Sequence, residues 1–94
     1  MSKRKGSRAE LRAIRILEAA GYVCTKAGGS LGVFDVIGIG PNDVRCIQVK
    51  AGQRPWLSPL EREAIALVTV PANVSKELWK MPDYCRQPTV EILK

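Results

Sequence analysis

Asp35, Gln48 and Lys50 are the polar residues of two segments that are otherwise mostly apolar near them, VFDVIGI and CIQVK. Burying a carboxylate, an amide or an ammonium group is costly unless the groups bind one another or a metal ion. Carboxylate and amide oxygens are ligands that Mg²⁺ accepts. A bound metal ion polarises a phosphate and lowers the pKa of a water molecule, and a nearby lysine can orient that water or offset transition-state charge. The three residues therefore suggest a divalent-metal site for phosphodiester hydrolysis.

A β-hairpin would bring these three side chains together. Residues 40–43, GPND, are turn formers between two apolar runs, which predicts two antiparallel strands joined by a tight turn. With these four residues as the loop, Ile37 faces Cys46 and Asp35 faces Gln48. Because side chains alternate between the faces of a strand, Gln48 and Lys50 then share a face with Asp35. A one-residue slip in register would undo this arrangement.

Two further ligands are available to such a site. The backbone carbonyl of Val49 is one, and the carboxylate of Glu10 is the other if a predicted helix over residues 7–20 packs there. Glu10 also fits a second role, because Ser7 and Glu10 match a capping box, and periodicity alone favours that role. The apolar stripe predicted for this helix consists of Leu11, Ala13, Ile14, Ile16, Leu17 and Ala20.

The remaining elements predict one mixed α/β domain with helices packed on a single sheet. A strand is expected at 22–26, followed by a glycine-rich loop in which Ser30 is either a turn residue or a phosphate contact. Ser58, Pro59 and Glu61 predict the start of a second helix, with Leu60, Ala64, Ile65, Leu67 and Val68 on its buried side. Short strands are expected at 69–70 and 78–81, and a last edge strand at 89–93.

Composition narrows the function classes. The 94 residues contain 15 Lys and Arg against 9 Asp and Glu, a formal net charge of +6, which favours a polyanionic partner such as nucleic acid. There is no histidine, which excludes His-based catalysis and His-metal sites. Cys24, Cys46 and Cys85 lack zinc or CxxC spacing and predict reduced thiols in an intracellular protein, and no segment reaches the roughly 20 apolar residues of a membrane span. The candidate DNA contacts are Lys3, Arg4 and Lys5 in a loose basic tail (1–6), the ridge Arg8, Arg12 and Arg15, and Lys26 and Arg54.

Several of these segments also resemble a known family. RKGSRAELRAIRILEAAGY, the GGS loop, FDVIGIG and CIQVK followed by a helix resemble, in order and spacing, the PD-(D/E)xK nuclease superfamily. Within it they are most similar to the Holliday junction resolvases of archaea and their viruses and phages. The resemblance is best over residues 4–67. It implies one nuclease domain over 1–94 with a restriction-endonuclease-like α-β-β-β-α-β core.

The resemblance also implies an activity and its requirements. It implies an intracellular, cytoplasmic homodimer that nicks four-way DNA junctions with Mg²⁺, for which Mn²⁺ substitutes, without a small-molecule cofactor or a membrane partner. Glu10 matches the family's metal-binding glutamate of the early helix, which favours a ligand role over capping alone. Ser30 matches a serine implicated in cleavage, and Asp35 and Lys50 match the catalytic aspartate and lysine.

Two positions depart from the family pattern. Gln48 stands where the family has a glutamate, and Phe34 stands where a proline is usual. A neutral amide removes one negative charge from the metal site, although restriction enzymes acting on methylated DNA resemble this superfamily and often have a QxK form. Three hypotheses therefore remain: a junction resolvase, a nuclease of the same fold acting on duplex, flap or methylated DNA, and a nucleic-acid-binding module without catalysis.

Overall fold

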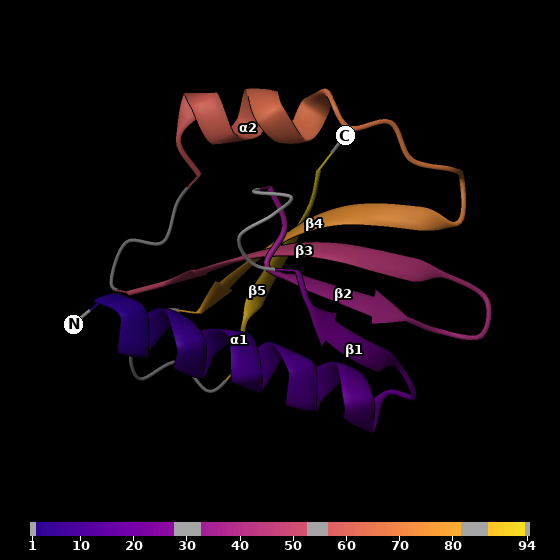
Figure 1. Cartoon of the computed structure of the whole chain (residues 1–94), viewed down its shortest axis with the longest axis horizontal. Helices are drawn as coiled ribbons and strands as arrows, with labels where there is room; N and C mark the ends of the chain where they lie inside the picture. The colour runs from indigo at the N-terminus through magenta and orange to yellow at the C-terminus, as the bar shows by residue number, and fades with distance from the viewer. Residues whose placement is uncertain (1, 28–32, 53–56, 82–86, 94) are drawn as a thin grey trace.

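The computed structural model describes residues 2–27, 33–52, 57–81 and 87–93, with side chains in the first helix from Arg8 onward. A five-stranded sheet lies between two helices, one on each face (Figure 1). The elements in chain order are α1 (Ser2–Ala19), β1 (Val23–Lys26), β2 (Val36–Ile39), β3 (Val44–Ala51), α2 (Pro59–Ala66), β4 (Val74–Met81) and β5 (Thr89–Leu93). The predicted mixed α/β architecture is confirmed. No helix of the described residues is long and apolar enough to cross a membrane.

The sheet has the order β1-β2-β3-β4-β5. Its β3–β4 pair is parallel and the other pairs are antiparallel. A parallel pair needs a crossover connection, and α2 lies within that connection between β3 and β4. This topology places α2 on the face opposite α1, so that each face of the sheet has its own apolar core.

The β2–β3 hairpin has the predicted register. Ile39 pairs with Val44 and Ile37 pairs with Cys46, as the four-residue turn requires. The prediction that the first strand of this hairpin includes Asp35 was wrong, because β2 begins only at Val36. The regular ladder ends at the pair of Val36 and Ile47, and β3 extends beyond it. Asp35 therefore lies directly before the ladder rather than within it.

The start of α1 differs from the prediction. The helix begins at Ser2, so Ser7 lies within it rather than at its N-cap, and residues 2–6 are helical rather than a loose tail. Lysine and arginine are good helix formers, and the cost of one interior glycine is only about 1 kcal/mol. A helix held by packing further along can therefore continue through Gly6.

The predicted apolar stripe of α1 is confirmed at Ala13 and Leu17 but was wrong at Leu11 and Ile16. Ala9, Ala13 and Leu17 are buried against the sheet, whereas Leu11 and Ile16 are about two-fifths exposed. The sheet residues that they contact in this core include Val36, Ile47, Val49, Trp79 and Met81. Small alanine side chains allow the helix to approach the strands closely. Helix propensity and the spacing of large apolar residues do not reveal that this face is the buried one. With this face of α1 against the sheet, Glu10 is half-buried at the edge of the helix–sheet contact.

The capping box of α2 is confirmed. The Ser58 side chain accepts a hydrogen bond from the Glu61 amide, the Glu61 side chain accepts one from the Ser58 amide, and Pro59 follows the cap. The predicted buried face was partly wrong, because Leu60 and Leu67 are nearly four-fifths exposed and only Ile65 is fully buried. The helix has eight residues and contacts its core mainly through that one side chain.

The chain after α2 also departs from the prediction. Residues 69–70 form no strand, and β4 starts at residue 74 instead of 78. Buried Lys76 of β4 donates hydrogen bonds to the carbonyls of Ile65 and Val68, at 3.1 and 2.9 Å. The Ile65 carbonyl lies in the last turn of α2, and a lysine that hydrogen-bonds such a carbonyl stabilises the C-terminus of the helix. The edge strand at 89–93 is confirmed as β5.

Candidate active site

Asp35 is fixed against β3 by two hydrogen bonds. The Val49 amide donates to Asp35 Oδ2 at 2.8 Å, and the Asp35 amide donates to the Ile47 carbonyl at 2.8 Å. The structure thus places Asp35 beside β3 at the level of Gln48, as predicted. A bond between side chain and backbone holds it there, in place of the ladder pair that the sequence suggested.

The alternation of β3 separates its residues between the two cores. Ile47 and Val49 belong to the core under α1, whereas Cys46 packs against the core under α2. Gln48 therefore lies on the α2 face with Lys50. It is 9% exposed and lines a cavity of about 180 Å³ together with Glu61 and apolar residues of α2.

Glu61 contacts the predicted site residue Lys50, although the sequence indicated only a capping role for it. Lys50 Nζ donates a hydrogen bond to Glu61 Oε2 at 2.6 Å, which joins the end of β3 to the first turn of α2. The other carboxylate oxygen, Oε1, accepts from the Ser58 amide at 3.0 Å. Burial raises the pKa of Glu61, but the bonds from Lys50 and Ser58 outweigh it and lower the pKa below its ordinary value. The neutral amide of Gln48 is the one sequence signal that could have directed attention to a carboxylate on a neighbouring element.

The carboxyl groups of Asp35 and Glu10 lie in one electrostatic environment. Burial raises the pKa of Asp35, the Val49 amide and the charge of Lys50 counteract it, and the charge of Glu61 adds to it. Burial also raises the pKa of Glu10, and the charge of Asp35 raises it further, while Lys26 lowers it. Glu10 from α1 therefore lies within electrostatic reach of Asp35, before β2, and of Lys26 from β1. A cation bound beside these two partly buried carboxylates would offset the raised pKa of each, because it favours their ionised forms.

The donor atoms near Asp35 fit a hard divalent cation. In the described part of the chain no three Cys, Asp or Glu side chains gather closely enough to hold a metal ion by themselves. The ligands predicted from the sequence are the carboxylates of Glu10 and Asp35, the Gln48 amide oxygen and the Val49 carbonyl. In an extended strand the N–H and C=O of one residue point to the same edge, so the Val49 carbonyl is directed to the side on which Asp35 lies. Mg²⁺ commonly takes one or two carboxylates and completes its shell with water and phosphate.

Some of the other predicted site residues have described side chains, and the rest do not. Arg8 and Arg15 are exposed on α1, Arg12 is partly buried there, and Lys26 is exposed at the end of β1. Ser30 and Arg54, which were predicted to contact phosphate or DNA, lie outside the described residues, as does Cys85. Lys3, Arg4 and Lys5 belong to the first turns of α1, and their side chains are likewise outside the described part.

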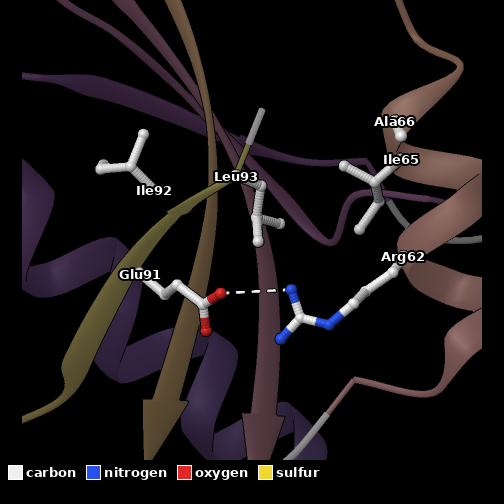
Figure 2. Close-up of a pocket in the computed structure, with 6 residues that line it drawn as sticks. All are labelled: Arg62, Ile65, Ala66, Glu91, Ile92 and Leu93. Carbon is white, nitrogen blue, oxygen red and sulfur yellow. Dashed lines mark hydrogen bonds and ion pairs between the residues drawn. The ribbon is translucent and has the colours of Figure 1, made fainter.

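A second cavity, of about 270 Å³, lies between α2 and β5 (Figure 2). Arg62 of α2 and Glu91 of β5 point toward each other across it and form an ion pair at 3.2 Å. Glu91 also pairs with Lys80 at 3.4 Å. None of the lining residues is one of the predicted site residues, and the ion pair ties β5 to α2 near the end of the chain.

Comparisons with known proteins agree with the fold. No family model matches the sequence, and no curated protein matches it in sequence. The structure is similar to that of Archaeoglobus fulgidus Hjc, a Holliday junction resolvase from an archaeal hyperthermophile. The TM-score is 0.74 with 18% identical residues, over 95% of this chain and 71% of that chain. Similarity at this identity shows a shared fold, so the mixed α/β core that the sequence resemblance implied is confirmed.

Proposed function

We propose that this protein is a metal-dependent DNA endonuclease that nicks branched DNA, in the manner of a Holliday junction resolvase. One observation carries the proposal. The Asp35 carboxylate accepts a hydrogen bond at 2.8 Å from the amide of Val49, the residue between Gln48 and Lys50 in the chain, on a fold shared with the resolvase Hjc. An acidic residue and a lysine at the same end of a hairpin are the groups that metal-assisted phosphodiester hydrolysis requires.

The proposed chemistry assigns each residue a task. Glu10 and Asp35, with the Gln48 amide oxygen and the Val49 carbonyl, would hold Mg²⁺, or Mn²⁺ in its place. Such an ion polarises the scissile phosphate and lowers the pKa of a bound water. Lys50 donates hydrogen bonds from its ammonium group, which orient the attacking water and offset charge on the phosphate in the transition state.

The proposed DNA surface lies on the side of α1 and β1. Arg8, Arg15 and Lys26 are exposed there, and Lys26 is close enough to Glu10 to lower its pKa. Contacts from such cations to phosphates position a protein on DNA without reading its sequence. The described part of each chain contains one candidate site, so symmetric nicks on two opposed strands imply a homodimer.

The proposed function is tested by cleavage of an end-labelled synthetic four-way junction beside a linear duplex of the same sequence. Both are incubated with Mg²⁺, with Mn²⁺ or with EDTA, using the wild-type protein and Asp35→Asn. We expect paired, symmetric nicks on the junction only, which EDTA and the substitution abolish. Metal-dependent cutting of the linear duplex as well, or preferentially of a methylated duplex, would instead indicate a nuclease of this fold with another target.

A non-catalytic nucleic-acid-binding module is the second candidate. Gln48 favours it, because a buried neutral amide stands where the sequence resemblance implies a metal-binding carboxylate. This candidate predicts that the junction is bound and retarded in a gel but stays intact with every metal ion tested. Nicks that depend on both the metal ion and Asp35 would eliminate it.

A further inference from the structure

We infer that Glu61 is a positioning residue of the proposed active site, whose carboxylate on α2 replaces the negative charge that Gln48 lacks on β3. This inference rests on the proposed nuclease function and deepens it. The contact that carries it is the hydrogen bond from Lys50 Nζ to Glu61 Oε2 at 2.6 Å. The residues are eleven positions apart, and their contact joins the end of β3 to the first turn of α2.

The geometry of Glu61 differs from that of an ordinary surface ion pair. Its Oε1 is fixed by the Ser58 amide at 3.0 Å, and its own amide is bound by Ser58 Oγ at 3.2 Å. The carboxylate therefore has a defined orientation before it meets Lys50. Both side chains are partly screened from solvent, with exposed fractions of 39% for Glu61 and 28% for Lys50. A preoriented carboxylate can hold a flexible lysine side chain in one place, which lowers the entropy lost when that lysine acts.

The charges of the site support the same role. In an Asp, Glu and Lys set, the lysine has a carboxylate two residues before it on the same face of its strand. Here that position holds the neutral Gln48. The negative charge of Asp35 and the positive charge of Lys50 therefore cancel, and the three residues together carry no net charge. Glu61 restores one negative charge beside them, and its charge reaches Asp35, since it contributes to the raised pKa of that carboxyl group. Glu61 and Gln48 also line the same cavity.

Glu61→Gln separates this role from helix capping. Glutamine keeps a side-chain oxygen that can accept from the Ser58 amide, so the capping box can persist, but it loses the charge that attracts Lys50. Glu63→Gln is the matched control, because Glu63 is an exposed glutamate on the same helix, two residues on. The double variant Gln48→Glu/Glu61→Gln moves the carboxylate back to β3, two residues before Lys50. A cap defect at α2 would not be repaired by a substitution on β3.

The first experiment measures single-turnover junction cleavage at saturating protein, together with junction binding in Ca²⁺. Glu61→Gln should slow cleavage by about 10–100-fold, as loss of a residue that orients a site residue commonly does, with binding unchanged. Glu63→Gln should leave both unchanged. Gln48→Glu/Glu61→Gln should recover most of the lost rate. Equal rates for wild type and Glu61→Gln, or a loss that the double variant does not recover, would overturn the inference.

A metal-free measurement keeps the test independent of catalysis. In the wild-type protein without divalent ions, the Lys50 ammonium protons should exchange slowly enough to give a ¹H–¹⁵N NMR signal, because Glu61 holds them. That signal should vanish in Glu61→Gln and reappear in the double variant. Absence of the signal from the wild type would contradict the inference directly. Failure of wild-type protein to cleave any DNA would refute the proposed function instead, while leaving this measurement valid.

Discussion

Replacing Glu77 by glutamine should strongly destabilise the fold. Glu77 of β4 is 2% exposed, and its carboxylate accepts hydrogen bonds from Arg45 Nε and Nη2, at 2.8 and 2.7 Å. It also accepts from Trp79 Nε1 at 2.8 Å and from the Ser75 hydroxyl. The Arg45 guanidinium in turn lies over the rings of Trp79 and Tyr22. Glutamine would remove the charge and point an amide NH₂ at groups that are themselves donors.

The magnitude follows from the burial of the pair. Breaking a buried ion pair by removing one partner costs about 3–5 kcal/mol, because the other charge is left uncompensated. The Arg45 side chain is 23% exposed and can recover some hydration, so the low end, about 3 kcal/mol, is expected. Since single domains have a total stability of about 5–15 kcal/mol, the loss is a large part of it. With a urea m-value of about 1–3 kcal/mol/M, the unfolding midpoint should fall by at least about 1 M.

The pH dependence gives this prediction a sign. Burial raises the pKa of Glu77, but the bonds from Arg45, Ser75 and Trp79 outweigh it and lower the pKa below its ordinary value. The folded protein thus binds this proton more weakly than the unfolded chain does. The stabilisation is therefore present above the ordinary carboxyl pKa and is lost as pH falls below it. The difference in unfolding free energy between wild type and Glu77→Gln should shrink from pH 7 to pH 3.

Equilibrium urea denaturation followed by tryptophan fluorescence measures both quantities. The control is Arg45→Met/Glu77→Met, which removes both charges and should cost less than Glu77→Gln alone. A cost for Glu77→Gln below about 1 kcal/mol, the range of exposed ion pairs, would refute the reasoning. If the difference in unfolding free energy between wild type and Glu77→Gln did not change with pH, the predicted pH dependence would be refuted.

Three further predictions concern the site. Asp35→Asn should abolish cleavage but raise the urea midpoint of the metal-free protein at pH 7, because asparagine can keep the bond from Val49 without burying a charge; a lowered midpoint would contradict this. Lys50→Met should abolish cleavage and leave the junction dissociation constant nearly unchanged, and a parallel loss of binding would count against a catalytic role. Arg8→Gln/Arg15→Gln should weaken junction binding and reduce the salt slope of the logarithm of the binding constant by about 1 for each lost phosphate contact. An unchanged slope would make these arginines ordinary solvated surface.

Local interactions made several features predictable. The turn residues 40–43 set the β2–β3 register, because a fixed loop length and strict alternation leave one pairing that buries the apolar side chains. Ser58 and Pro59 marked the start of α2, since caps act within one turn. The same kind of signal failed at Ser7, where a continuing helix overrode a matching cap pattern.

The sequence by itself determined the fold class, the hairpin and the convergence of Asp35 with the end of β3, because these depend on neighbours along one or two strands. Only the tertiary structure decided which face of α1 is buried, since this depends on how closely Ala9 and Ala13 approach the sheet. It also decided that Lys50 meets Glu61 and that Arg45 meets Glu77. Those partners are brought together by the parallel β3–β4 crossover, and pairing across a crossover leaves no periodic signal in the chain.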